Sequence, residues 1–524
     1  MKVFKFMIKS ENKKLYIILL ILVALLAVFI RTWRFGEIPG GMNQDGAMAA
    51  VDAKALGDYG TDRFGMRYPV HLTAWGYGQM SALMSYLMAP CIKLLGLSVL
   101  SARLPMLLVS LAALIFAALF ARQAGGMKLQ LIVFFLAAVN PWHILQSRWA
   151  LDCNLFPHFL LGGFSMLGAA ASGRKKCLPV SMILFALSMY CYGISIYTVP
   201  LLLTASCILL LKRKLLTRRQ ALGAAAVYFL IAWPFLACMI INTFRLETIE
   251  TPLFTIPFFP YSMRSSDILF FSEEPLRQLL SNARSLFSIM MQKYNGYVFN
   301  EIRGFGTLYV FSIPFMVAGC ILCFVRSRKN TVCALTAVWF LTAVFAGLVT
   351  ANVNINRINI LFYPLILFTG IGIDAFLSLF RKAEMRLAIS SALTAVYLCA
   401  FCLFGYTYFT AYASQLENSF MADFGRAVTA TREDDAEKVY ISADAQYKGY
   451  SHVSEILTLF YLDIDARYYQ SAAFRERFTF RIPDNPDLTE DAVYVLARDD
   501  LPKFDPLLFT ITDYGKFLVA KKAP

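Results

Sequence analysis

Five carboxylates are concentrated in one short, glycine-rich stretch of a chain that is otherwise poor in charge. Only 16% of the 524 residues are charged, yet residues 36 to 79 contain Glu37, Asp45, Asp52, Asp58 and Asp62. Asp45 follows Gly40-Gly41, and a carboxylate in such a turn is well placed to accept a proton from a hydroxyl group. Its position just before a predicted helix at 47–56 equally suits a helix N-cap. We expect Asp52 and Asp58 to be solvated.

A second group of polar residues follows the motif Asn140-Pro-Trp-His143. Arg148 and Asp152 lie four residues apart, so on a continuous helix they would form a structural ion pair. Near a membrane surface, the same arginine and aspartate could instead hold a phosphate and a hydroxyl group. The residues alone leave both interpretations open. His143 is predicted to be an interfacial partner of Trp142 rather than a ligand.

A third group surrounds Arg357, which has asparagines at 352, 354, 356 and 359 as neighbours. A guanidinium binds phosphate oxygens in a fork, so this group could cradle an anion. The alternative is that these polar residues only mark the level of the lipid headgroups at the end of a membrane helix.

Composition shows what must position these groups. The chain is 58% hydrophobic, and its charged fraction is well below the roughly 25% of soluble domains. Apolar runs of about 20 residues recur from Leu15 to Thr410, which is typical of a polytopic α-helical membrane protein. We predict about eleven transmembrane helices, at 15–30, 101–122, 128–146, 153–171, 177–193, 195–211, 220–242, 305–325, 331–350, 357–380 and 386–411.

The charge distribution predicts the orientation and argues against nucleic-acid binding. The net charge is +15, but residues 413–524 carry 19 acidic and 13 basic side chains, so the first 412 residues carry +21. This basic excess lies in short clusters such as Arg174-Lys-Lys176, which are typical of cytoplasmic loops. With eleven helices, the N-terminus would be cytoplasmic and the C-terminal domain extracytoplasmic. The eleven cysteines lie in or near apolar segments, where helix packing is the expected role.

Two domains are expected, namely a membrane domain at 1–412 and a small α/β domain at 413–524. The membrane domain has two long outer loops, 36–100 and 243–304, and each is predicted to contain an amphipathic helix, at 79–96 and 272–287. The C-terminal domain is predicted to contain a helix at 452–461 and strands at 438–442, 466–469, 492–496, 508–511 and 516–520.

These motifs together resemble the GT-C glycosyltransferases, in the branch of the protein O-mannosyltransferases and the lipid A aminoarabinose transferase. The resemblance covers most of residues 15–411. It is carried by Asp45, Trp75-Gly-Tyr-Gly-Gln79, Ala102-Arg-Leu-Pro105, Ser147-Arg-Trp-Ala-Leu-Asp152, and Arg357 with Tyr363-Pro364.

The resemblance implies a donor sugar linked to polyprenyl phosphate and an outer-face acceptor, which would be a glycan, a lipid or a protein. It implies catalytic roles for Asp45 and Asp152, and donor-phosphate contacts for Arg148 and Arg357. Some relatives use a loop lysine for the phosphate, and the nearest basic groups here are Arg63, Arg67 and His71. The expected acceptor or sugar contacts are Asn43, Gln44, Trp75, Gln79 and Asn154.

Two points limit what the resemblance implies. Many relatives have Asp-Glu in the first loop, where this chain has Asp45-Gly46, and the dependence on a divalent metal is left open. The competing hypotheses are a multi-pass transporter or lipid flippase, and a membrane assembly factor. A transporter more often has inverted repeats and ionisable groups at the bilayer midplane, neither of which is evident in this sequence.

Overall fold

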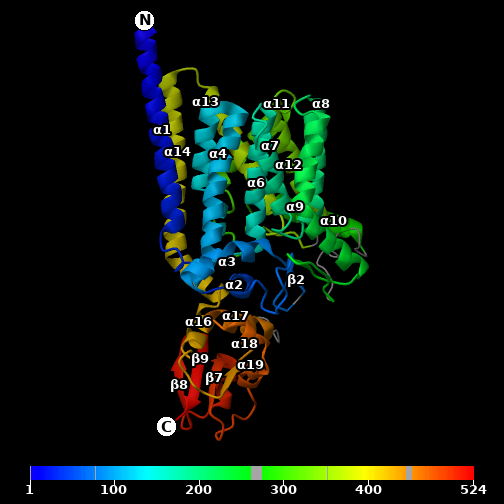
Figure 1. Cartoon of the computed structure of the whole chain (residues 1–524). Helices are drawn as coiled ribbons and strands as arrows, with labels where there is room; N and C mark the ends of the chain where they lie inside the picture. Colours follow the sequence, from blue (N-terminus) through cyan, green and yellow to red (C-terminus); the bar gives the residue numbers. More distant parts are fainter. Residues whose placement is uncertain are drawn as a thin grey trace.

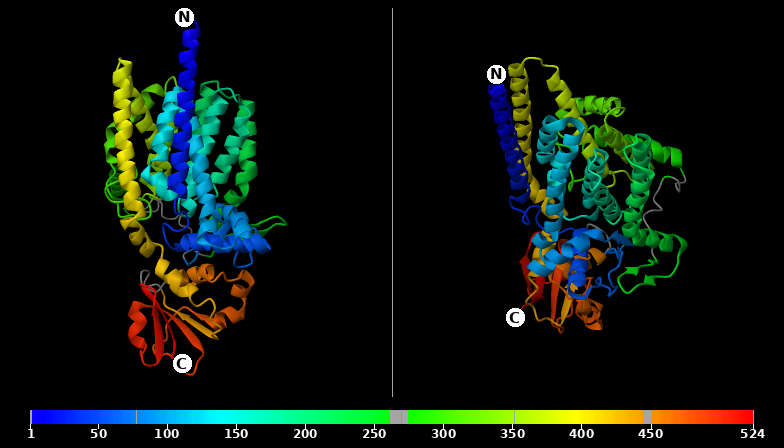
Figure 2. Two further views of the ribbon diagram at one scale, coloured as in Figure 1. Left: turned by 90° about the vertical axis from the view of Figure 1, so that its left-hand side faces the viewer. Right: turned by 45° about the horizontal axis from the view of Figure 1, so that its top comes forward.

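The structure is a computed structural model, and it describes residues 2–523 apart from 77, 261–268, 270–273, 351 and 444–450. Tyr77 of the first-loop motif and the first residues of the helix predicted at 272–287 therefore lie outside the described residues. Figure 1 shows a bundle of long helices, a layer of short helices at one end, and the C-terminal domain beyond that layer. The two further views in Figure 2 show the same order of layers.

Helices occur at all the spans that the apolar runs predict. They are α1 (Lys2–Thr32), α4 (Val99–Ala138), α6 (Asp152–Ala171), α7 (Cys177–Ser188), α8 (Ser195–Lys212), α9 (Arg218–Phe244), α11 (Ile313–Arg326), α12 (Thr331–Val349), α13 (Phe362–Ser378) and α14 (Ala383–Phe409). The long helix α4 contains two of the predicted spans, because the backbone turns at Gly125–Gly126, where Gly126 has a φ of 75°.

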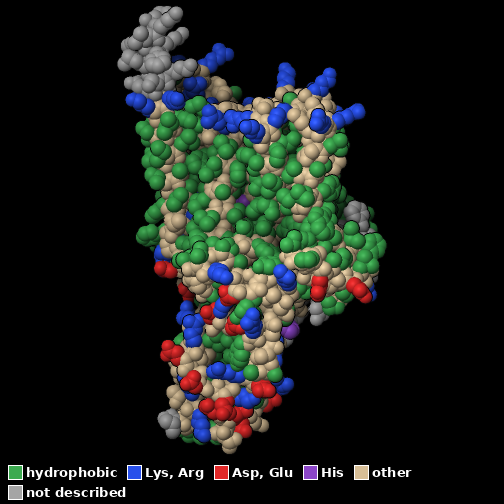
Figure 3. All heavy atoms as spheres, in the orientation of Figure 1, with side chains coloured by type: hydrophobic (Ala, Val, Ile, Leu, Met, Phe, Trp, Pro, Cys, Tyr) green, Lys and Arg blue, Asp and Glu red, His purple; other side chains and the backbone are tan. Residues whose placement is uncertain are grey.

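The protein is a multi-pass membrane protein. Among the described residues, seven helices are long and apolar enough to cross a membrane, and the count of eleven crossings stays a prediction. Figure 3 shows an apolar belt across the face of the bundle that is turned toward the viewer. Lysine and arginine gather at the end of the belt that lies far from the C-terminal domain, and acidic side chains appear at the opposite end.

Several predicted membrane helices are shorter than expected, since α7 ends at Ser188 rather than at 193 and α11 begins at Ile313 rather than at 305. The span predicted at 128–146 ends at Ala138, and the separate short helix α5 (Pro141–Gln146) follows it. Asn140 causes this division because its side chain accepts a hydrogen bond from the backbone N–H of His143 and so begins a new helix before Pro141.

The first outer loop is largely ordered into regular elements. It contains α2 (Gln44–Tyr59), the antiparallel hairpin of β1 (His71–Thr73) and β2 (Gln79–Ser81), and α3 (Leu83–Leu95). The helix predicted at 79–96 thus begins later, because its first residues form β2. The second outer loop contains β3 (Ile249–Glu250), β4 (Thr255–Ile256) and the amphipathic helix α10 (Pro275–Met290), which confirms that prediction for its described part.

Arg148 holds the segment between α1 and α2 against the bundle. Its side chain is fully buried and donates hydrogen bonds of 2.8 to 3.2 Å to the backbone carbonyls of five residues, namely Ile30, Arg31, Trp33, Arg34 and Ile38. Residues 33–43 form neither helix nor strand, so their carbonyls need donors from other parts of the chain. The guanidinium supplies these donors in a fixed plane.

Two more buried arginines complete this arrangement. Arg103 of α4 donates to the carbonyls of Pro39 and Gly41, both at 2.6 Å, and Arg31 of α1 donates to the carbonyls of Ala137 and Ala138 at the end of α4. The three arginines therefore join α1, α4 and the start of the first outer loop. The loop that carries Asp45 is fixed to the bundle as a result.

The C-terminal domain is a mixed five-stranded sheet with helices. The strand order is β6-β5-β7-β9-β8, with β5 parallel to both β6 and β7, and β9 antiparallel to both β7 and β8. The elements are α15 (Ala411–Ser419), α16 (Ala422–Thr429), β5 (Lys438–Ile441), α17 (Ser451–Tyr461), α18 (Ala466–Gln470), α19 (Ala472–Arg477), β6 (Phe478–Thr479), β7 (Ala492–Ala497), β8 (Phe509–Asp513) and β9 (Phe517–Lys522).

The strand predicted at 466–469 is wrong, because these residues form helix α18. Tyrosines favour strands, but the Asp465 side chain accepts hydrogen bonds from the N–H groups of Arg467 and Tyr468. Such capping starts a helix in spite of the local strand propensity. The other four predicted strands and the helix at 452–461 are confirmed.

The C-terminal domain packs directly on α2. Lys54 pairs with Asp463 at 2.5 Å, the Tyr59 hydroxyl donates to Asp465 at 2.6 Å, and the Arg467 guanidinium lies 4.1 Å from the ring centroid of Tyr59. Helix α2, which carries Asp45 in its first turn, is therefore held between the bundle and the C-terminal domain.

We expect Arg148→Gln to destabilise the protein. A glutamine amide cannot satisfy five carbonyls, so several buried acceptors would lose their donors at a cost of about 3 kcal/mol or more. The midpoint of thermal unfolding in a lipid-like detergent should fall by about 5 °C or more. The exposed Arg303, replaced in the same way, should leave the midpoint unchanged. An unaltered midpoint for Arg148→Gln would contradict the structural role.

Candidate active site

A cavity of about 290 Å³ lies where the first outer loop meets the bundle. The described residues that line it come from distant parts of the chain: Asp45, His71, Gln79, Met80, Ser81, Leu151, Asp152, Cys153, Tyr192, Gly193, Ile194, Ile196, Tyr197, Phe235, Met239, Thr350, Asn354, Asn356 and Arg357. The cavity has a polar part made of carboxylates, amides, hydroxyls and one guanidinium. Aliphatic and aromatic side chains form the remainder.

The fold brings together five of the residues that the sequence singled out. Asp45 comes from α2, His71 and Gln79 from the β1–β2 hairpin, Asp152 from α6, and Arg357 from the segment before α13. Residues 45 and 357 are far apart in the chain, so only the packing of the helix bundle places them at one cavity.

Both carboxylates lie in the first turn of a helix. The N-cap of α2 is Asn43, so Asp45 is not the cap that its position suggested; its carboxylate instead accepts a hydrogen bond of 2.6 Å from Trp75 Nε1. Asp152 begins α6, and its carboxylate accepts from the N–H of Cys153 at 2.6 Å. The positive end of each helix dipole favours the ionised form of these acids.

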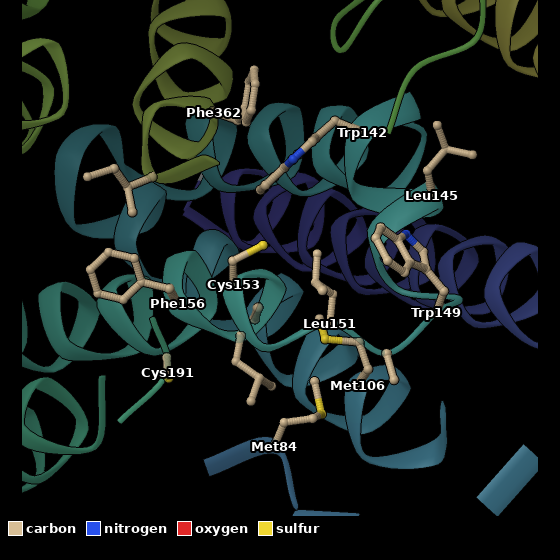
Figure 4. Packing of buried hydrophobic residues seen from close by; sticks show 14 of the residues in the cluster. Met84, Met106, Trp142, Leu145, Trp149, Leu151, Cys153, Phe156, Cys191 and Phe362 are labelled. Carbon is tan, nitrogen blue, oxygen red and sulfur yellow. The ribbon is translucent and has the colours of Figure 1, made fainter. Parts of the chain in front are cut away.

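Buried apolar neighbours fix the position of Asp152. Leu151 and Cys153 on either side of it belong to a cluster of buried hydrophobic side chains that includes Met84 of α3 and Met106 of α4 (Figure 4). This packing leaves the intervening carboxylate at the cavity wall.

Arg148 does not belong to this site. Neither interpretation of the Arg148 and Asp152 pair holds, because the helix is interrupted between Gln146 and Asp152 and the guanidinium binds backbone carbonyls instead. Among the described residues, the cavity lining does not include Arg148. The donor-phosphate contact that the resemblance implied for it is thus corrected to a structural role.

Arg63 and Arg67 are also placed away from the described cavity lining. Arg63 is buried, pairs with Asp52 at 2.6 Å, and donates to the carbonyls of Thr73 and Ala74. It therefore stabilises the loop. Asp52 is fully buried, so the prediction that it is solvated is wrong, whereas Asp58 is exposed as expected. Arg67 is exposed.

His71 lines the cavity as a neutral group. Its side chain is buried at the edge of two aromatic rings, with ring-centroid distances of 6.0 Å to Phe235 and 6.1 Å to Phe259. Burial lowers the pKa of His71 to about 4, so the imidazole is uncharged at neutral pH. Arg63, Arg67 and His71 were the three candidates for a basic group of the loop that contacts the donor phosphate. A neutral imidazole does not suit that role.

The other expected contacts are divided between the cavity and its surroundings. Gln79 lines the cavity and Trp75 binds the carboxylate of Asp45. Asn43 and Asn154 are buried next to the two acids, and Gln44 begins α2, but the described lining includes none of these three.

Sequence reasoning missed the wall contributed by α8 and its neighbours. The Tyr197 hydroxyl lies 2.5 Å from Thr350 Oγ1, and both residues line the cavity with Asn354 and Asn356. Tyr192-Gly193 could have indicated this wall in the sequence, because the pair separates the apolar runs of α7 and α8. Both residues line the cavity.

The residues present do not complete a metal-ligand set. Within the described part of the chain, no group of three or more His, Cys, Asp and Glu side chains could hold a metal ion.

Comparison with known proteins shows the fold class. No family model and no curated protein matches the chain. The structure is similar to ArnT from Cupriavidus metallidurans in the apo state, with a TM-score of 0.57, 12% identity and 98% of each chain covered. ArnT bound to undecaprenyl phosphate gives a TM-score of 0.57 at 12% identity, covering 96% of this chain and 98% of that one.

An oligosaccharyltransferase from Archaeoglobus fulgidus, in complex with Zn and sulfate, is also similar. Its TM-score is 0.54 at 13% identity, and the match covers 84% of this chain and 61% of the oligosaccharyltransferase. The chain therefore has the GT-C fold of membrane glycosyltransferases, as the sequence motifs predicted.

The structure explains why a glycine follows Asp45. A Cβ atom at Gly46 would lie 2.8 Å from Asn43 Oδ1, 3.0 Å from the carbonyl oxygen of Ala150 and 3.1 Å from Met42 Sδ. No side chain fits there without moving its neighbours. Position 46, where many relatives have a second acidic residue, therefore has no room for a carboxylate side chain in this chain. Asp152 provides the other carboxylate of the cavity.

We expect Gly46→Ala to destabilise the protein by about 1–3 kcal/mol, the usual cost of overpacking. Gly57→Ala in the same helix is the matched control, because its Cβ would find no atom closer than 3.5 Å. Replacing a helical glycine at an open position should be neutral or should stabilise by about 0.5–1 kcal/mol. Thermal unfolding of both variants measures the difference, and equal midpoints would contradict the crowding at Gly46.

Proposed function

We propose that this protein is a membrane glycosyltransferase that moves a sugar from a polyprenyl-phosphate-linked donor to an acceptor on the outer face of the membrane. The observation that carries the proposal is the single cavity that contains Asp45, Asp152 and Arg357 within a GT-C fold. The solved ArnT structure with undecaprenyl phosphate supports the donor class. The Archaeoglobus oligosaccharyltransferase tethered with an acceptor peptide, which has a TM-score of 0.50, supports transfer to a separate acceptor molecule.

Asp45 acts as the general base in this proposal. It removes the proton from the acceptor hydroxyl as the acceptor oxygen forms its bond to the anomeric carbon of the sugar. The bond between that carbon and the phosphate oxygen breaks, and the lipid phosphate leaves with the bonding electron pair. The hydrogen bond from Trp75 Nε1 fixes one oxygen of the Asp45 carboxylate and leaves the group oriented.

Arg357 is proposed to bind the departing phosphate, because its guanidinium supplies several donors and a fixed positive charge. Asp152, which lines the same cavity, is proposed to position the acceptor. The apolar wall of Ile194, Ile196 and Met239 suits the first units of the prenyl chain.

We propose that the N-terminus is cytoplasmic and that residues 413–524 form an extracytoplasmic domain. The basic side chains at the end of the bundle far from this domain support the orientation through the positive-inside bias (Figure 3). Alkaline phosphatase fused after residue 524 should be active in intact cells, because the enzyme needs the oxidising outer compartment. An inactive fusion that is still expressed and membrane-bound would reverse the orientation.

We expect Asp45→Asn to lower the rate of sugar transfer by about 10²–10⁴-fold, the range of a lost general base, with little change in donor binding. Purified protein in lipid would receive radiolabelled polyprenyl-phosphate sugars, and release of free lipid phosphate would be followed. Asp58→Asn is the control, because this exposed carboxylate of the same helix lies outside the described cavity lining. Full activity of Asp45→Asn would remove Asp45 from the mechanism, and no turnover with any donor would refute the proposed function.

A further inference from the structure

The β1–β2 hairpin presents one polar face to the cavity. In the antiparallel register, His71 pairs with Ser81 and Thr73 pairs with Gln79. Side chains alternate along a strand, so these four residues share a face of the hairpin. Of these, His71, Gln79 and Ser81 line the cavity, and the apolar side chain of Met80 in β2 lines it as well. The hairpin thus contributes an imidazole, a carboxamide and a hydroxyl group to one wall.

Two polar atoms on this wall are buried and have no hydrogen-bond partner in the described structure. They are Nδ1 of His71, whose side chain is only 6% exposed, and Nε2 of Gln79. Burying a polar atom without a partner is costly, and such atoms in native proteins usually meet a ligand or water. The wall therefore has unused hydrogen-bonding capacity that points to a ligand.

The chemistry of this wall suits hydroxyl groups better than a phosphate. Its three side chains are uncharged, since the pKa of the buried His71 lies well below neutral pH, while the guanidinium of Arg357 belongs to a different segment. The Phe235 ring lies 6.0 Å from the His71 ring and also lines the cavity. A sugar has a hydroxyl-bearing edge and an apolar C–H face, which match the polar hairpin and this aromatic ring.

We propose that the β1–β2 hairpin forms the subsite for the donor sugar, in which His71 and Gln79 hydrogen-bond to ring hydroxyls and Phe235 packs on the C–H face. This inference rests on the proposed function and deepens it. Gln79 Nε2 donates, and His71 Nδ1 donates or accepts according to its tautomer. The subsite takes an uncharged sugar ring, because no cation or carboxylate belongs to the hairpin face that lines the cavity.

The test compares two ligands on the full-length protein in lipid nanodiscs. One is polyprenyl phosphate, and the other is polyprenyl phosphate that carries glucose, mannose, galactose or N-acetylglucosamine. The wild type should bind at least one of these sugar donors more tightly than the bare lipid phosphate. His71→Phe and Gln79→Met should each weaken binding of that donor about tenfold, as expected for a lost buried hydrogen bond, without changing binding of the bare lipid phosphate.

Three further variants separate sugar recognition from other effects. Thr73→Val alters the same hairpin face at a position outside the described cavity lining and should leave both affinities unchanged. Arg357→Gln should weaken both ligands, because it acts on the phosphate. His71→Asn retains a polar group and should recover part of the affinity that His71→Phe loses.

The inference is overturned if His71→Phe weakens both ligands equally, if it weakens neither, or if the wild type does not distinguish any sugar donor from the bare lipid phosphate. A shift in acceptor affinity alone would assign the hairpin to the acceptor and would also overturn it. The turnover assay tests the proposed function independently. If the protein turns over but His71→Phe binds the sugar donor as tightly as the wild type, only the subsite is refuted. If the affinity depends on the sugar but no turnover occurs, the transferase is refuted and the subsite is supported.

Discussion

The geometry of the cavity depends on buried arginines that bind backbone carbonyl groups. Between the end of α1 and the start of α2, residues 33–43 form neither helix nor strand, and the carbonyls of their buried part, such as those of Ile38 and Pro39, need donors from other parts of the chain. Arg103 and Arg148 supply the donors. Arginine suits this task because it stays charged and carries five N–H groups in one plane. The loop with Asp45 is thereby held against α4 and against the segment that directly precedes Asp152 and α6.

Gly41, in the segment between α1 and α2, allows this segment to pack closely against the C-terminal domain. A Cβ atom at Gly41, which has a φ of 78°, would collide with the backbone of Phe420 and Ala422 at the start of the C-terminal domain. The bundle thus contacts the loop on one side and the C-terminal domain contacts it on the other, with Lys54 and Tyr59 extending that second contact along α2. A single helix turn that carries Asp45 is consequently fixed by two separate parts of the chain.

The sequence predicted the helices well and the site partly, for physical reasons. The length of an apolar run determines a membrane helix locally, so the predicted spans correspond to observed helices. Asp45, Asp152 and Arg357 belong to three separate groups in the sequence and line one cavity in the structure, while their roles in a reaction stay predictions. The partner of an arginine is instead determined by tertiary structure, so the sequence could not show that Arg148 binds carbonyls. Burial likewise decides that Asp52 is paired and that His71 is neutral, and neither follows from residue type. At 466–469, a cap at Asp465 outweighed strand propensity.

The two carboxylates and the guanidinium also explain how the cavity could tolerate an anionic donor. In the proposed reaction, Asp45 gains a proton and loses its negative charge while the leaving lipid phosphate gains one. The total charge in the cavity therefore stays constant, and the reaction only moves negative charge from the start of α2 toward Arg357. Because α2 and α6 both begin at the cavity, the positive ends of their dipoles stabilise the acids before transfer. In the proposed reaction, the guanidinium of Arg357 binds the phosphate charge that develops afterwards. The two acids and the arginine come from three distant segments, namely α2, α6 and the residues before α13, which is why the first loop alone cannot form the site.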